Sequence, residues 1–311
     1  MSVKKKHPDT LIEAIRYFAD LDVATGFVAA LRWPDGPVCP ECGGKHHSYL
    51  TTRRLWKCKA CKKQFSVKVG TIFEDSPIPL DKWLAAIWMI ANAKNGVSSH
   101  ELGRSIGLTQ KSAWFVLHRV RLAMQTKTFD RLTGEVEVDE TFVGGKAKFM
   151  HPAKRRAKIK STGPHDKTAV VGVLNRDSEV RASVIPHIHK ATLERYVRRH
   201  VEPGSALYSD SSYGYAGLAG DYDHCVVNHA VKYVDGRVHT NGLENFWSLL
   251  KRGLKGTYVS VEPFHLFRYL DEQVFRFNTR KDNDLGRFVT VVARVSGRRL
   301  MYDALIGRAT T

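Results

Sequence analysis

Two kinds of side chain in this sequence occur at spacings that could bind metal ions. The first is a set of four thiols arranged C-x2-C-x15-C-x2-C, namely Cys39, Cys42, Cys58 and Cys61. Two tight turns that each offer two thiolates can surround one tetrahedral zinc ion. The spacing therefore predicts a zinc ribbon, with two disulfides or free thiols as the alternative. A ribbon this small would draw folding free energy from the metal, on the order of 10 kcal/mol.

The second kind is a set of three carboxylates in separate predicted elements. Asp139 ends an alternating, strand-like run that begins at Glu135, Asp210 follows the apolar residues 206–208, and Glu244 lies in a helical pattern. Carboxylates that converge through the fold commonly hold two Mg²⁺ ions about 4 Å apart for in-line attack on a phosphodiester. Any one of the three alone would be an unremarkable surface residue.

Alternation along the first strand separates Asp139 from its acidic neighbours. It places Val136 and Val138 on one face and Glu137 and Asp139 on the other. Glu140 is expected on the face opposite Asp139, and Glu137 is expected too far back along the strand to join the same site. A solvated edge strand is the alternative for this run.

The charge balance points to a polyanionic partner. Lysine and arginine number 49 against 31 aspartate and glutamate, which gives a net charge of +18. Nucleic acid explains such an excess best, and an anionic membrane surface is the rival explanation. The sequence does not support binding to a membrane, because no segment has 18 uninterrupted apolar residues and no signal peptide is visible. Paired cysteines of this kind fit a reducing compartment, so we expect a cytoplasmic protein, and the charge suggests that it is associated with DNA.

Turn-rich breaks and a change of hydrophobic period divide the chain into five segments. From about residue 134 onward, strand-like runs alternate with helical patterns, which predicts a mixed α/β domain. The expected segments are an N-terminal helical segment (1–36), a zinc ribbon (37–75), a helix-turn-helix segment (76–130), an α/β catalytic domain (131–285) and a basic C-terminal tail (286–311).

The helical segment has the layout of a helix-turn-helix. A short capped helix near Ser99 is followed by a glycine-containing turn and by a second helix that starts after Thr109. The second helix of such a motif can place its first side chains against base edges in the major groove. The predicted DNA contacts are Thr109, Gln110, Lys111 and Ser112. Ordinary helix packing would produce the same apolar spacing.

Three longer motifs carry a family resemblance. Residues 138–146 (VDETFVGGK), 208–210 (YSD) and 239–253 (HTNGLENFWSLLKRG) resemble the motifs of bacterial insertion-sequence transposases of the DDE superfamily. The group it resembles has an N-terminal zinc ribbon and a catalytic domain of ribonuclease H-like, integrase-like fold. Residues 31–40 and 70–73 are also similar to that group where it enters and leaves the ribbon.

The resemblance implies specific roles for residues of this chain. Asp139 and Asp210 would be the catalytic aspartates, Glu244 the third carboxylate and Lys251 the basic residue that follows it. Lys251 lies seven residues after Glu244, two helical turns further along the same face. Asn241 and Asn245 flank Glu244 and are the alternative third ligands.

Basic side chains extend the predicted site toward the DNA backbone. Arg252 follows Lys251, and a basic loop between the first two strands contains Lys154, Arg155 and Arg156. Such residues would contact phosphates rather than bases, and a merely solvated loop is the alternative.

The resulting hypothesis is a DNA transposase that cuts and rejoins DNA. It would use one structural Zn²⁺ and two catalytic Mg²⁺ or Mn²⁺ ions, bind double-stranded DNA at the element's terminal repeats and at the target, and act as a dimer or higher homo-oligomer. The alternatives are a transposase-derived DNA-binding regulator without catalysis, a nuclease acting on RNA–DNA hybrids, and a recombinase with a serine or tyrosine nucleophile.

Overall fold

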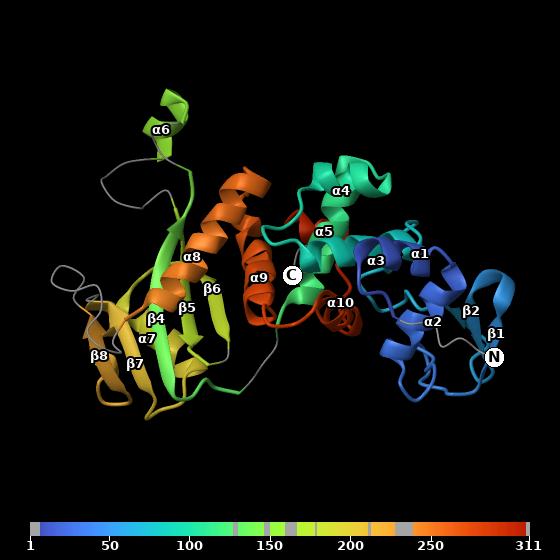
Figure 1. Cartoon of the computed structure of the whole chain (residues 1–311), viewed down its shortest axis with the longest axis horizontal. Helices are drawn as coiled ribbons and strands as arrows, with labels where there is room; N and C mark the ends of the chain where they lie inside the picture. The colour runs from blue at the N-terminus through green and yellow to red at the C-terminus, as the bar shows by residue number, and fades with distance from the viewer. Residues whose placement is uncertain are drawn as a thin grey trace. The chain divides into compact units, whose positions relative to one another are not determined.

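The chain forms two compact units, and the second is inserted within the first. The computed structural model describes residues 7–126, 130–145, 150–158, 167–177, 179–210, 213–227 and 239–308. One unit comprises Met1–Gln125 together with Lys281–Thr311, and the other comprises Thr126–Arg280. Figure 1 follows the chain through both units. No helix in the described ranges is long and apolar enough to cross a membrane.

The first unit combines a small three-stranded ribbon with helices. The ribbon strands pair antiparallel in the order β1-β2-β3. The elements are α1 (Leu11–Phe18), α2 (Leu21–Arg32), β1 (His47–Leu50), β2 (Leu55–Cys58), β3 (Gln64–Phe65), α3 (Leu80–Asn92), α4 (Ser99–Ile106), α5 (Gln110–Met124), α10 (Asp284–Ala293) and α11 (Tyr302–Leu305). The N-terminal helices, the ribbon and the later helix pair thus all belong to this unit.

The C-terminal segment departs from the sequence prediction. Residues 286–311 were expected to form a basic tail, but α10 is part of the core of the first unit. Its Phe288 is fully buried and its ring contacts the rings of Phe18, Phe27 and Trp88. The many basic residues of this segment obscure an apolar helical stripe, which is why the packing is not evident from charge and composition.

A mixed five-stranded sheet forms the centre of the second unit. Its order is β6-β5-β4-β7-β8, where β4, β5 and β6 pair antiparallel and β4, β7 and β8 pair parallel. The strands are β4 (Glu135–Val143), β5 (Thr168–Asn175), β6 (Val180–Ile185), β7 (Ala206–Asp210) and β8 (Asp223–Val227). The predicted ribonuclease H-like α/β fold, preceded by a zinc-ribbon region, is confirmed.

Helices cover both faces of this sheet, and the alternation of β4 and β5 decides which side chain meets which helix. One core joins Val136 and Val138 of β4 to α7 (Lys190–His200). The opposite core joins Val170 and Leu174 of β5 to α8 (Asn241–Gly253) and α9 (Leu266–Asn278). The faces of β4 therefore follow the alternation seen in the sequence. The unit also contains α6 (Pro152–Lys158) and a π-helical turn (Leu254–Tyr258) that continues α8.

Candidate active site

The four cysteines of the ribbon lie together at two neighbouring turns. Their sulfur atoms all lie within 4.8 Å of one another, and the Cys39–Cys61 and Cys42–Cys58 sulfurs are each 3.6 Å apart. Four sulfurs that each bind zinc at about 2.3 Å would be about 3.8 Å apart in a tetrahedron. All four are free cysteines, so the disulfide alternative is not formed. This cluster can hold one zinc ion.

The helix pair α4 and α5 has a sharp turn at Gly107, which adopts a left-handed conformation with φ of 65°. The predicted DNA-contacting residues cluster at the start of α5. Thr109 caps α5 by accepting a hydrogen bond from the backbone N–H of Ser112, and its hydroxyl donates to the Ser112 hydroxyl. The Gln110 amide donates to Ser99 in α4. Thr109, Gln110 and Lys111 are exposed, and Ser112 is half-buried.

Asp139 and Asp210 are brought together by strand register. The parallel strands β4 and β7 pair Glu135 with Ala206 and Glu137 with Tyr208. The same register continued by two residues places Asp139 beside Asp210, the last residue of β7. Asp139 lies in the middle of β4 and Asp210 ends β7, so the two carboxylates meet beside the carboxyl end of β7. Ligands of open α/β sheets bind at such strand ends.

Asp139 lies in surroundings that disfavour its negative charge. Burial, followed by the nearby charges of Glu140 and Asp210, raises its pKa to about 7. Two hydrogen bonds oppose the shift: the indole N–H of Trp247 donates to Oδ2 at 2.9 Å, and the backbone N–H of Glu140 donates to Oδ1 at 2.8 Å. A cation placed here would relieve the repulsion, so the site favours a metal ion or a proton.

Glu140 faces the other side of the sheet, as the alternation predicts. The Tyr215 hydroxyl, fully buried in the core that contains α7, donates a hydrogen bond of 2.6 Å to its Oε2. Burial, despite this hydrogen bond, raises the pKa of Glu140, and the charge of Asp210 adds to the shift. Its charge still acts on Asp139, although its carboxylate belongs to a different face.

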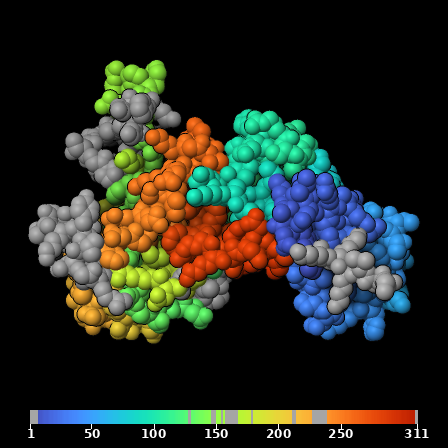
Figure 2. Space-filling model, viewed as in Figure 1, coloured from blue at the N-terminus to red at the C-terminus, as the bar shows by residue number. Residues whose placement is uncertain are grey.

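The third predicted carboxylate lies on the outer face of α8. This face carries a stripe of exposed polar residues, and Figure 2 shows α8 (orange) at the surface of the second unit. The stripe consists of Asn241, Glu244, Asn245, Ser248, Lys251 and Arg252. Within the described residues, the four cysteines are the one group of three or more potential metal ligands already close together. Glu244 lies on α8, which packs on the same sheet. Its carboxylate does not form a group of potential metal ligands with those of Asp139 and Asp210.

Comparison with known proteins identifies the family of the chain. Residues 131–278 match the family described as the ISXO2-like transposase domain, and residues 22–64 match the transposase zinc-ribbon domain. The chain belongs to the insertion-sequence transposases of the DDE type. It is also similar to an uncharacterized protein in transposable element ISH50 of Halobacterium salinarum, with 28% identity over 257 residues that cover 77% of this chain and 85% of the relative.

The two matched regions contain most of the residues singled out in this transposase. The ribbon match spans all four cysteines, and the transposase-domain match spans Asp139, Asp210, Glu244 and Lys251. The helix pair α4 and α5 lies between them. The basic loop also lies within the second match: Arg155 and Arg156 are exposed on α6, whereas the side chain of Lys154 lies outside the described residues.

Trp247 is a site residue that the sequence does not single out, because a tryptophan in a helical apolar pattern indicates core packing. Its spacing gives no signal either, because Trp247 is on the buried side of α8 whereas Glu244, three residues earlier, is exposed. In the transposase it packs over Gly172, the β5 partner of Asp139. A Cβ atom on Gly172 would lie 2.9 Å from the indole. The glycine thus leaves room for the ring that holds Asp139.

Proposed function

We propose that this transposase is an active DNA-cutting and DNA-joining enzyme that uses Asp139, Asp210 and Glu244. The observation that carries the proposal is the pair of aspartates on adjacent parallel strands, where burial and the charges of Glu140 and Asp210 raise the pKa of Asp139 to about 7. Enzymes concentrate such costly charges at functional sites. Carboxylate oxygens are the donors that Mg²⁺ and Mn²⁺ prefer, so the side chains fit those ions.

Each residue has a defined task in this proposal. Asp139 and Asp210 bind divalent ions from the sheet, and Glu244 binds from α8. When bound, two such ions supply Lewis-acid stabilisation of the charge that develops on the phosphodiester. Lys251 lies two helical turns after Glu244 on the same exposed face and contacts a phosphate near the scissile bond. Water attacks to cut the element end, and the freed 3′-hydroxyl attacks the target strand.

DNA binding is assigned to the first unit and to the basic residues near the site. Gln110 and Lys111 at the start of α5 contact bases, with Thr109 and Ser112 beside them, while Arg252 and the α6 arginines contact the backbone. The ribbon binds one Zn²⁺. Because two element ends must be held together, the proposal includes a dimer or higher oligomer on DNA. The net charge of +18 supports a DNA partner.

The test is cleavage and strand transfer on duplexes that carry the element ends, with Mg²⁺. Asp139→Ala, Asp210→Ala and Glu244→Ala are each expected to lower both rates at least ~1000-fold, since several kcal/mol of charge stabilisation is lost. DNA affinity should stay within about twofold, because these residues neutralise no phosphate. Asp223→Ala, at the exposed start of β8, is the matched control and should cut normally.

Other outcomes identify the alternatives. A wild-type chain that binds its ends but never cuts them would indicate a DNA-binding regulator. Normal cutting by Glu244→Ala, together with loss of cutting in Asn241→Ala or Asn245→Ala, would move the third ligand to an amide.

A further inference from the structure

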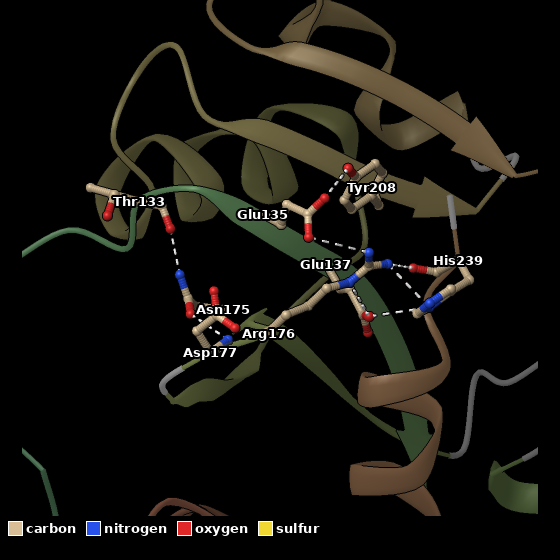
Figure 3. A network of polar contacts seen from close by, with 8 residues as sticks. All are labelled: Thr133, Glu135, Glu137, Asn175, Arg176, Asp177, Tyr208 and His239. Atoms are coloured by element: carbon tan, nitrogen blue, oxygen red, sulfur yellow. Dashed lines mark hydrogen bonds and ion pairs between the residues drawn. The ribbon is translucent and has the colours of Figure 1, made fainter. Parts of the chain in front are cut away.

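A buried polar network joins the catalytic strand to the start of α8. Glu137 lies two residues before Asp139, on the same face of β4, and is only 1% exposed. Its Oε2 accepts a 3.0 Å hydrogen bond from the backbone N–H of Leu243, in the first turn of α8. Its Oε1 accepts a 3.0 Å hydrogen bond from Nε of Arg176. Figure 3 shows the carboxylate between Arg176 and the segment that leads into the helix.

Arg176 connects this carboxylate to two further elements. Its Nη2 donates a 2.8 Å hydrogen bond to the carbonyl oxygen of His239, just before α8. Its guanidinium lies 4.4 Å from the centre of the Tyr208 ring on β7. Tyr208 is two residues before Asp210, and its hydroxyl donates to Glu135 on β4. Arg176 therefore contacts residues that are close in sequence to each of the three proposed metal ligands.

The close approach of α8 to the sheet depends on Gly242. A Cβ atom there would lie 2.8 Å from Oε2 of Glu137 and 2.3 Å from Cδ2 of Leu174. A larger residue there would displace the side chains of Leu174 and Glu137 or the helix itself. The first turn of α8 is thus seated directly on the carboxylate and on β5.

Glu137 also provides the side-chain acceptor that the N-cap residue of α8 does not provide. The N-cap residue Thr240 makes no side-chain capping hydrogen bond. The first N–H groups of a helix need acceptors, and a negative charge is favourable at that end. A carboxylate fixed in the sheet satisfies one of these groups and at the same time sets where the helix begins.

We propose that Glu137, held by Arg176 and His239, is a positioning residue that sets the placement of Glu244 relative to Asp139. Glu244 directly follows Leu243, the residue whose N–H Glu137 accepts, so any shift of the first turn moves it as well. The inference rests on the proposed function, because it requires Glu244 to be a metal ligand. Supporting residues of this kind typically change metal affinity or activity by about 10- to 100-fold when they are lost.

The test uses full-length Glu137→Gln and the matched control Glu135→Gln. Glutamine retains one acceptor oxygen, so it cannot serve both Leu243 and Arg176 as the carboxylate does. Glu135 is also a carboxylate beside Arg176, with 3.7 Å between Oε2 and Nη1, but the hydrogen bond to the first turn of α8 comes from Glu137. Two quantities are measured: Mn²⁺ binding by electron paramagnetic resonance, and the Mg²⁺ concentration for half-maximal cleavage.

Glu137→Gln is expected to weaken Mn²⁺ binding and to raise the Mg²⁺ midpoint about tenfold or more, with cleavage largely restored at high Mg²⁺. DNA affinity is expected to be unchanged. Glu135→Gln should stay within about threefold of wild type by the same measures. If Glu137→Gln does not fold, His239→Ala is the second variant. It removes the imidazole, whose Nδ1 lies 3.4 Å from Oε1 of Glu137 and 3.1 Å from Nη2 of Arg176, and a rise of about threefold is expected.

Two results would overturn the inference in different ways. Wild-type Mn²⁺ binding and Mg²⁺ dependence in a folded Glu137→Gln chain would reject the positioning role while leaving the proposed function intact. Absence of Mn²⁺ binding that depends on Asp139 in the wild-type chain would reject the proposed function, and the positioning role with it.

Discussion

The zinc ribbon and the carboxylate site gather their ligands in different ways. The four thiols come from two local turns, where the backbone N–H of Gly43 donates to the carbonyl of Cys39 and that of Lys62 to the carbonyl of Cys58. Their sulfurs are already close enough for one ion. The carboxylates come from two strands and a helix, and sheet register unites only Asp139 and Asp210. Local turns can assemble a complete ligand set alone, whereas distant elements need additional contacts to be positioned.

Loss of a thiol is the substitution expected to distinguish the two regions most strongly, through its effect on zinc binding and folding. Cys58→Ser is expected to abolish zinc binding and to unfold the ribbon, because the metal contributes on the order of 10 kcal/mol to such small folds. Zinc content and hydrogen exchange of residues 39–65 measure this, with the amides of β4 and β5 as the internal reference. Cys225→Ser, at the fifth cysteine, is the control and should retain one zinc. A ribbon that stays protected without zinc would contradict the comparison.

Loss of a carboxylate should have the opposite effect on stability. In the folded chain the pKa of Asp139 is raised to about 7 by burial and by its acidic neighbours, whereas an unfolded aspartate titrates near ~3.9. Stability is therefore fullest below that lower pKa and falls as the pH rises toward the folded pKa. Without divalent metal at pH 8, Asp139→Asn is expected to stabilise the folded chain by on the order of 2 to 4 kcal/mol.

Thermal melts of Asp139→Asn in EDTA measure this prediction. The gain in Tm should shrink at pH 5, where the wild-type carboxylate is mostly protonated in the folded chain. Asp177→Asn, an exposed aspartate after β5, should melt like wild type at both pH values. A gain that does not depend on pH would show that the charge of Asp139 is not the cause.

Removing the indole hydrogen bond to Asp139 is expected to have a smaller effect, on the Mg²⁺ dependence of cleavage. Trp247→Phe keeps most of the ring but removes the 2.9 Å hydrogen bond to Oδ2. We expect the Mg²⁺ midpoint for cleavage to rise about tenfold, or ~1.4 kcal/mol, as for other groups that orient a ligand. Phe246→Leu alters the core side of the same helix and should lower Tm without moving the midpoint. Equal midpoints in both variants would mean that Trp247 acts by packing alone.

The contrast between local turns and distant elements also explains which features of the fold and the site the sequence predicts. The cysteine spacing is sufficient for the ribbon, because its geometry is local. Alternation in residues 135–140 correctly separates the faces of β4. The role of Trp247 and the network around Glu137 are not predictable, because they depend on which strand pairs with which and on how closely α8 approaches the sheet. The packing of Phe288 is missed because it is a contact between ends of the first unit far apart in sequence.

The insertion of the second unit into the first affects the order in which the protein can form. During synthesis, β4 through α9 leave the ribosome before α10, so the unit with the proposed catalytic residues can reach its folded state first. The core around Phe18 and Trp88 must wait for Phe288, which is translated 270 residues after Phe18. The part of the chain translated first is therefore among the last to be completed.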